Sequence, residues 1–60
     1  MPEVSRALRN GHYDRAFTIV SIETGNRAVA AAFLLESGVG VDELPVGAKR
    51  AIAEARSEAA

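Results

Sequence analysis

The sequence predicts an all-α fold, a small bundle of three or four short helices. Alanine, the strongest helix former, occupies twelve of the 60 positions. Segments with apolar residues at helical spacing alternate with short stretches that contain glycine. The chain has no cysteine, so neither a disulfide nor a cysteine zinc site stabilises it. Residues 1–60 are therefore expected to form one small domain, completed by oligomerisation or by a partner.

The first helix is predicted over residues 2–9. Pro2 is favourable in the first turn of a helix. Asn10 and Gly11 follow the segment and are typical of a helix C-terminus. One apolar stripe at helical spacing joins Val4, Ala7 and Leu8.

Residues 13–24 allow two interpretations, a helix or a strand over residues 16–22. The segment Phe17–Ile22 is rich in β-branched residues, which favour strands. Apolar and polar residues do not alternate cleanly, because Ile19 and Val20 are adjacent and both apolar. A strand would also need a partner strand, which only a second copy of the chain offers. We therefore favour the helix.

The third helix is predicted over residues 27–37. Asn26 is a favourable N-cap residue, and Gly38 ends the segment. Its residues 28–35 are eight apolar residues in a row. A helix that is apolar all round must be buried all round. A chain of this length has little material to surround it, so a second copy or a partner protein is expected to help bury it.

Residues 39–44 are predicted to form a loop, because they include Gly40 close after Gly38. The last helix is expected to begin between Leu44 and Gly47. Asp42 and Glu43 would then lie at its N-terminus, where the helix dipole favours acidic side chains.

The last helix is predicted to end near Ser57. Its charged residues include Arg50 and Glu54, which are spaced for an i,i+4 ion pair. An apolar stripe is formed by Ala48, Ala51, Ile52 and Ala55.

Two segments resemble parts of known helical families. Residues 25–42 are similar to the second half of an ankyrin repeat, in which a Gly-Asn pair precedes a Leu-Leu-Glu-x-Gly helix end, but the spacing is one residue longer. Residues 13–37 resemble a ubiquitin-associated three-helix domain in Thr24-Gly25-Asn26 and in the closing pair of leucines. This spacing is one residue shorter, and residues 10–12 replace the Met-Gly-Phe loop of that family. Neither resemblance assigns a functional residue.

The residues that could carry catalysis do not form a recognisable motif. His12 stands beside Tyr13 and Asp14 and could act as a general base. Adjacent residues in a turn rarely converge, so we favour a loop or helix-cap role for it. Gly38-Val39-Gly40 matches half of a phosphate-binding loop, but the third glycine position holds Glu43. We expect no enzymatic activity, cofactor, metal or small-molecule substrate.

The net charge of −1 is unfavourable for a protein that binds phosphate backbones. The alternative function is nevertheless a small dimeric DNA-binding regulator with a helix-turn-helix-like C-terminal half. It would be favoured if the four arginines of the N-terminal half, Arg27 included, met on one face of a dimer. Its candidate nucleic-acid contacts are Arg6, Arg9, Arg15, Lys49 and Arg50.

The preferred interpretation is a non-catalytic protein that acts through helix packing, as a structural or accessory subunit of a bacterium or phage. Its partner would be a second copy or a larger protein, and its location the cytoplasm or a virion. The apolar run over residues 28–35 is much shorter than the roughly 20 residues of a membrane span. The predicted core and interface residues are Phe17, Ile19, Val20, Ile22, Val29, Phe33, Leu34, Leu35 and Ile52.

Overall fold

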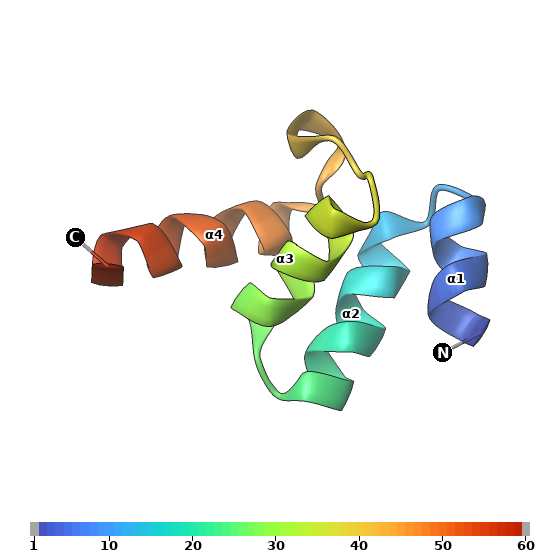
Figure 1. The fold of residues 1–60 in the computed structure, drawn as a ribbon, viewed down its shortest axis with the longest axis horizontal. Coiled ribbons are helices and arrows are strands. Elements are labelled where there is room, and N and C mark those ends of the chain that lie inside the picture. The colour runs from blue at the N-terminus through green and yellow to red at the C-terminus, as the bar shows by residue number, and fades with distance from the viewer. Residues whose placement is uncertain (1, 60) are drawn as a thin grey trace.

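A computed structural model describes residues 2–59. This part of the chain is an all-α bundle without strands, as predicted. Consecutive helices pack against each other, α1 on α2, α2 on α3 and α3 on α4. Figure 1 shows α1 and the end of α4 at opposite ends of the long axis, with α2 and α3 between them. The elements are α1 (Pro2–Arg9), α2 (Tyr13–Thr24), α3 (Arg27–Glu36), the 3-10 turn η1 (Val41–Glu43) and α4 (Val46–Ala59).

The first helix ends where the sequence predicts, in a Schellman motif. Gly11 has a φ of 76°, a left-handed conformation that glycine adopts without steric cost. The amide of His12 donates to the carbonyl of Ala7 at 2.8 Å, and that of Gly11 donates to Leu8 at 3.2 Å. These two bonds satisfy carbonyl groups that the end of a helix leaves free. The turn between α1 and α2 is thereby fixed.

Residues 16–22 are helical, so the strand interpretation is wrong. Ala16, Phe17 and Val20 are buried together, the spacing of one helical face. Packing of this face outweighs the strand preference of the β-branched residues. The hydroxyl of Thr18 donates to the carbonyl of Asp14 at 2.9 Å, a local bond that a helix allows.

The turn between α2 and α3 follows the predicted capping chemistry. Gly25 has a φ of 68°, and its amide donates to the carbonyl of Ser21 at 2.8 Å. The side-chain oxygen of Asn26 accepts from the amides of Ala28 at 2.9 Å and Val29 at 3.2 Å. Both the end of α2 and the start of α3 are confirmed.

The third helix ends at Glu36, one residue earlier than predicted, in a second Schellman motif. Gly38 has a φ of 99°, and the amide of Val39 donates to the carbonyl of Leu34 at 3.1 Å. In this motif the residue after the glycine commonly packs on the last turn of the helix. Val39 and Leu34 are accordingly both in the core.

Asp42 and Glu43 do not lie at the start of the last helix, as the sequence analysis expected. They belong to η1, and α4 begins at Val46 with no acidic residue in its first turn. Pro45 disfavours a helical conformation at the residue before it. Leu44 is accordingly extended, with φ −62° and ψ 142°, and it separates the two helices. At its other end α4 runs to Ala59, two residues beyond the predicted end.

The core of the described residues is narrow, because half of its twelve buried apolar residues are alanines. Alanine side chains let helices approach closely but remove little apolar area from water. The largest fully buried side chains are those of Leu34, Val4 and Val20. The remaining members are Ala7, Ala16, Phe17, Ala30, Ala31, Val39, Leu44, Ala48 and Ala51.

The apolar run of α3 is buried on one side only, whereas its sequence predicts burial on all sides. Ala30, Ala31 and Leu34 are buried, while Val29 is 47% and Leu35 37% exposed. Within the described residues, α3 packs against two helices, α2 and α4. The rest of its surface is open to solvent.

Candidate interaction surfaces

The predicted core and interface residues fall into three groups in the structure. Phe17, Val20 and Leu34 are buried in the core. Ile19, Phe33 and Ile52 are partly buried and pack against the core. The third group is exposed and consists of Ile22, Val29 and Leu35. The structure thus separates residues that hold the monomer together from residues that remain available to another molecule.

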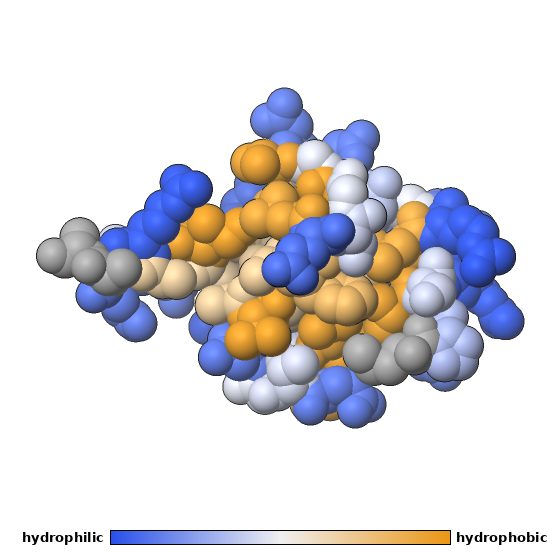
Figure 2. Space-filling view, in the orientation of Figure 1, coloured by the Kyte–Doolittle hydropathy of each residue, from blue (hydrophilic) through white to orange (hydrophobic). Residues whose placement is uncertain are grey.

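Two valines join the exposed group, although the sequence analysis did not select them. Val46 is 73% and Val41 65% exposed, comparable with Ile22 at 75%. Figure 2 shows apolar side chains gathered across the middle of one face, over α2 and α3 and toward α4. The exposure of Val41 could be predicted from the sequence, because a large aliphatic side chain in a glycine-rich loop has no helix or strand to cover it. We call Ile22, Val29, Leu35, Val41 and Val46 the exposed aliphatic residues.

A groove of about 490 Å³ lies where the N-terminal half of α2 meets the start of α4. Its apolar wall comes from Phe17, Leu44, Pro45 and Val46. Gly47 brings α4 close to α2, because a Cβ atom at this position would lie 3.0 Å from Cε2 of Phe17. The rim is polar and includes Asp14 and Thr18. The groove thus combines an apolar wall with a polar rim.

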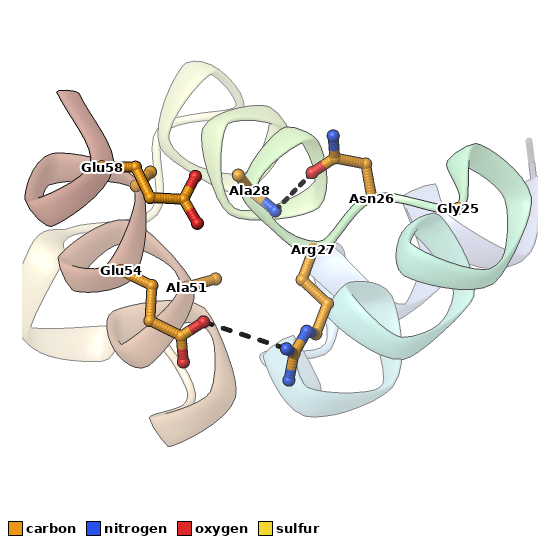
Figure 3. A pocket seen from close by; sticks show the side chains of 8 residues that line it. Gly25, Asn26, Arg27, Ala28, Ala51, Glu54 and Glu58 are labelled. Atoms are coloured by element: carbon orange, nitrogen blue, oxygen red, sulfur yellow. Dashed lines mark hydrogen bonds and ion pairs between the residues drawn. The ribbon is translucent and has the colours of Figure 1, made fainter.

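A second hollow, of about 260 Å³, separates the start of α3 from the C-terminal half of α4 (Figure 3). Nη2 of Arg27 and Oε2 of Glu54 are 4.0 Å apart across it, and both side chains are more than half exposed. Glu58 lies one turn further along α4 at the same hollow. The expected pair of Arg50 with Glu54 does not form among the described residues, because Glu54 points toward α3 instead.

A third hollow, of about 280 Å³, lies between α1 and the start of α2. Its lining is about equally polar and apolar, and it includes two arginines from different helices. Within residues 2–59, neither of these arginines forms an ion pair with a carboxylate. The lining residues are Glu3, Arg6, Ala7, Asn10, His12 and Arg15.

The basic residues proposed as nucleic-acid contacts do not share one face. Arg6 and Arg15 line the hollow between α1 and α2, and Arg9 is exposed in the last turn of α1. Arg27 lies beyond the opposite end of α2, next to α4. Lys49 and Arg50 are exposed on α4, which is the helix most distant from α1 along the long axis. Arg27 is therefore separated from Arg6 and Arg15 within the monomer, and the DNA-binding alternative, which requires a common face in a dimer, stays a prediction.

His12 occupies the N-cap position of α2 and is exposed, but its side chain does not cap the helix. No hydrogen bond joins it to Asp14 within the described part of the chain. In that part, acidic and histidine side chains form no cluster able to hold a metal ion. None of the helices described is long and apolar enough to traverse a bilayer.

No protein-family model matches this sequence, and neither do any curated proteins or solved structures. The surfaces of the molecule are therefore interpreted from their own chemistry.

Proposed function

We propose that this protein is a non-catalytic interaction protein that binds a second copy of itself or a larger protein through its exposed aliphatic residues. A single observation carries the proposal. Three of these side chains, Ile22, Val41 and Val46, are at least 65% exposed, although the chain is short of large residues for its own core. Full burial of such a side chain contributes about 1.5–3 kcal/mol, and most of this free energy is not gained while the side chain stays in water. An interface that covers them recovers this free energy.

The groove between α2 and α4 supports the same function. Val46 stands at its edge and Phe17 forms its wall, so an apolar side chain from a partner would contact both. Interfaces commonly centre on an anchor residue that fills a pocket and is surrounded by a polar rim. Asp14 and Thr18 supply that rim here.

The size of the molecule is consistent with an accessory subunit. Its accessible surface is 4187 Å². A standard interface buries about 800 Å² on each partner, or roughly one fifth of this surface. An interaction face can therefore occupy a full side of the bundle. We infer that the chain works as a small assembly component in the cytoplasm or in a phage particle.

The test is the molar mass by light scattering over a dilution series, for the chain and for the double variant Ile22→Asp, Val46→Asp. Both residues are exposed, so the variant should keep its helical circular dichroism. We expect wild type to associate, and the variant to remain monomeric because the charges would be desolvated at an interface. A wild-type chain that stays monomeric is then tested for capture of a partner, which the double variant should lose.

A matched control replaces Ser5 and Ser57, which are exposed, polar and outside the groove, with Asp, so that both double variants lower the net charge by two. This control should associate like wild type. Equal loss in both double variants would attribute the effect to net charge and contradict a role for the exposed aliphatic residues.

A further inference from the structure

The hollow between α1 and α2 has features of a ligand site that the proposed function does not use. Its polar donors come from three pieces of the chain: Arg6 on α1, Asn10 and His12 in the turn, and Arg15 on α2. None of these four side chains forms a hydrogen bond or an ion pair within residues 2–59. Side-chain donors that line one hollow and have no partner within residues 2–59 are available to a ligand.

We propose that this hollow binds a phosphate monoester through the guanidinium groups of Arg6 and Arg15. Each guanidinium presents several N–H groups in a planar fork that matches the oxygens of a phosphate. The side chains of Asn10 and His12, in the turn between the two helices, add further N–H donors. A phosphate monoester has three terminal oxygens that can accept from donors on α1, the turn and α2 together, whereas a carboxylate has only two oxygens.

Hydrogen bonds fix the backbone of the segment that carries these residues. The amide of Asn10 donates to the carbonyl of Arg6 at 3.1 Å, and the amide of His12 donates to Ala7 at 2.8 Å. The carbonyl of His12 accepts from Ala16 at 3.1 Å, which joins the turn to the first turn of α2. Because His12 and Arg15 belong to the start of α2, the positive end of its helix dipole also lies at the hollow. The backbone at the site is thus ordered before a ligand arrives.

The size and surroundings of the hollow favour one small anion over a nucleic acid. Its volume of about 280 Å³ is at the lower limit of small-molecule sites. A duplex would need further cations along its backbone, but Lys49 and Arg50 lie on α4, the helix most distant from α1 along the long axis. Glu3 also lines the hollow, and its carboxylate opposes an anion there.

The experiment is a titration of the isotopically labelled protein with inorganic phosphate and with O-phospho-L-serine, followed by nuclear magnetic resonance at constant ionic strength. We expect saturable shifts at Arg6, Asn10, His12 and Arg15, at roughly millimolar ligand. Phosphoserine binding more tightly than phosphate would place the ester substituent in the site. Equal affinity would show that the phosphate group alone is recognised.

Variants make the assignment specific. Arg6→Gln and Arg15→Gln should each weaken binding about tenfold or more, the loss expected for a charged hydrogen-bonding partner. Arg56→Gln removes the same charge from exposed α4 and should leave the affinity unchanged. Glu3→Gln should tighten binding several-fold by removing the opposing carboxylate. All four positions are exposed, so the fold should persist in each variant.

Three results would overturn the proposal. They are the absence of saturable shifts, equal weakening by Arg56→Gln and Arg15→Gln, and an affinity for a single-stranded oligonucleotide that depends on Lys49 as strongly as on Arg6. The last result would assign the arginines to nucleic-acid binding. None of these outcomes alters the test of the exposed aliphatic residues, which lie outside the hollow.

Discussion

The inner and outer sides of the α2–α3 pair carry the same kind of side chain in opposite environments. Leu34 on α3 is fully buried, whereas Ile22 on α2 is 75% exposed, although both are large aliphatic residues. Composition therefore does not decide which side chain stabilises the monomer. The position around the helix decides it, and the outer side retains apolar area that can stabilise only a complex.

The inner side should show the largest effect on stability. Leu34→Ala removes the largest fully buried side chain and is expected to cost about 2–5 kcal/mol. A core this small contributes only about 3–5 kcal/mol to stability. We therefore expect the variant to be largely unfolded at 25 °C by circular dichroism. Leu34→Met conserves volume and should remain folded, and equal stability of the two would contradict the burial of Leu34.

The junction between α2 and α3 should show an intermediate effect. Asn26→Ala removes the side-chain oxygen that accepts from the amides of Ala28 and Val29. The expected loss is about 1 kcal/mol, measured as a lower urea midpoint with an unchanged slope. Asn26→Gly should cost only a few tenths of a kcal/mol. If Ala and Gly variants both match wild type, the cap does not contribute to stability.

The ion pair across α3 and α4 should matter less. Arg27 and Glu54 are more than half exposed and 4.0 Å apart, a geometry worth at most a few tenths of a kcal/mol. Arg27→Ala and Glu54→Ala are each expected to shift the thermal midpoint only slightly. A double-mutant cycle with a coupling energy above about 1 kcal/mol would show that this contact is stronger than an exposed pair.

The helix boundaries could be predicted because they depend on local chemistry. Gly11, Gly25 and Gly38 adopt positive φ at the ends of helices, and Asn26 caps the next one. Each signal lies within a few residues of the boundary it sets. Local chemistry does not decide the helical state of residues 16–22. The propensity of the β-branched residues favours a strand there, whereas tertiary packing favours the helix.

The surfaces could be predicted only in part. Residues 28–35 contain no polar side chain, so their sequence cannot indicate which side faces solvent. Val39 is buried because the residue after the glycine of a Schellman motif packs on the last turn of the helix. An apolar residue directly after Gly38 is the sequence signal for this packing. The meeting of Arg6 and Arg15 depends on how α1 packs against α2, which residue spacing does not specify.

The outer side of the α2–α3 pair gives the sharpest test of the contrast between Leu34 and Ile22. Truncation of an aliphatic side chain to alanine should cost almost no stability there. Ile22→Ala removes an aliphatic side chain that makes little contact with the monomer. Alanine is also the better helix former, by a few tenths of a kcal/mol. The urea midpoint of the monomer should therefore stay the same or rise slightly. A loss above about 1 kcal/mol would mean that Ile22 packs within the monomer, and the outer side would then no longer be free for a partner.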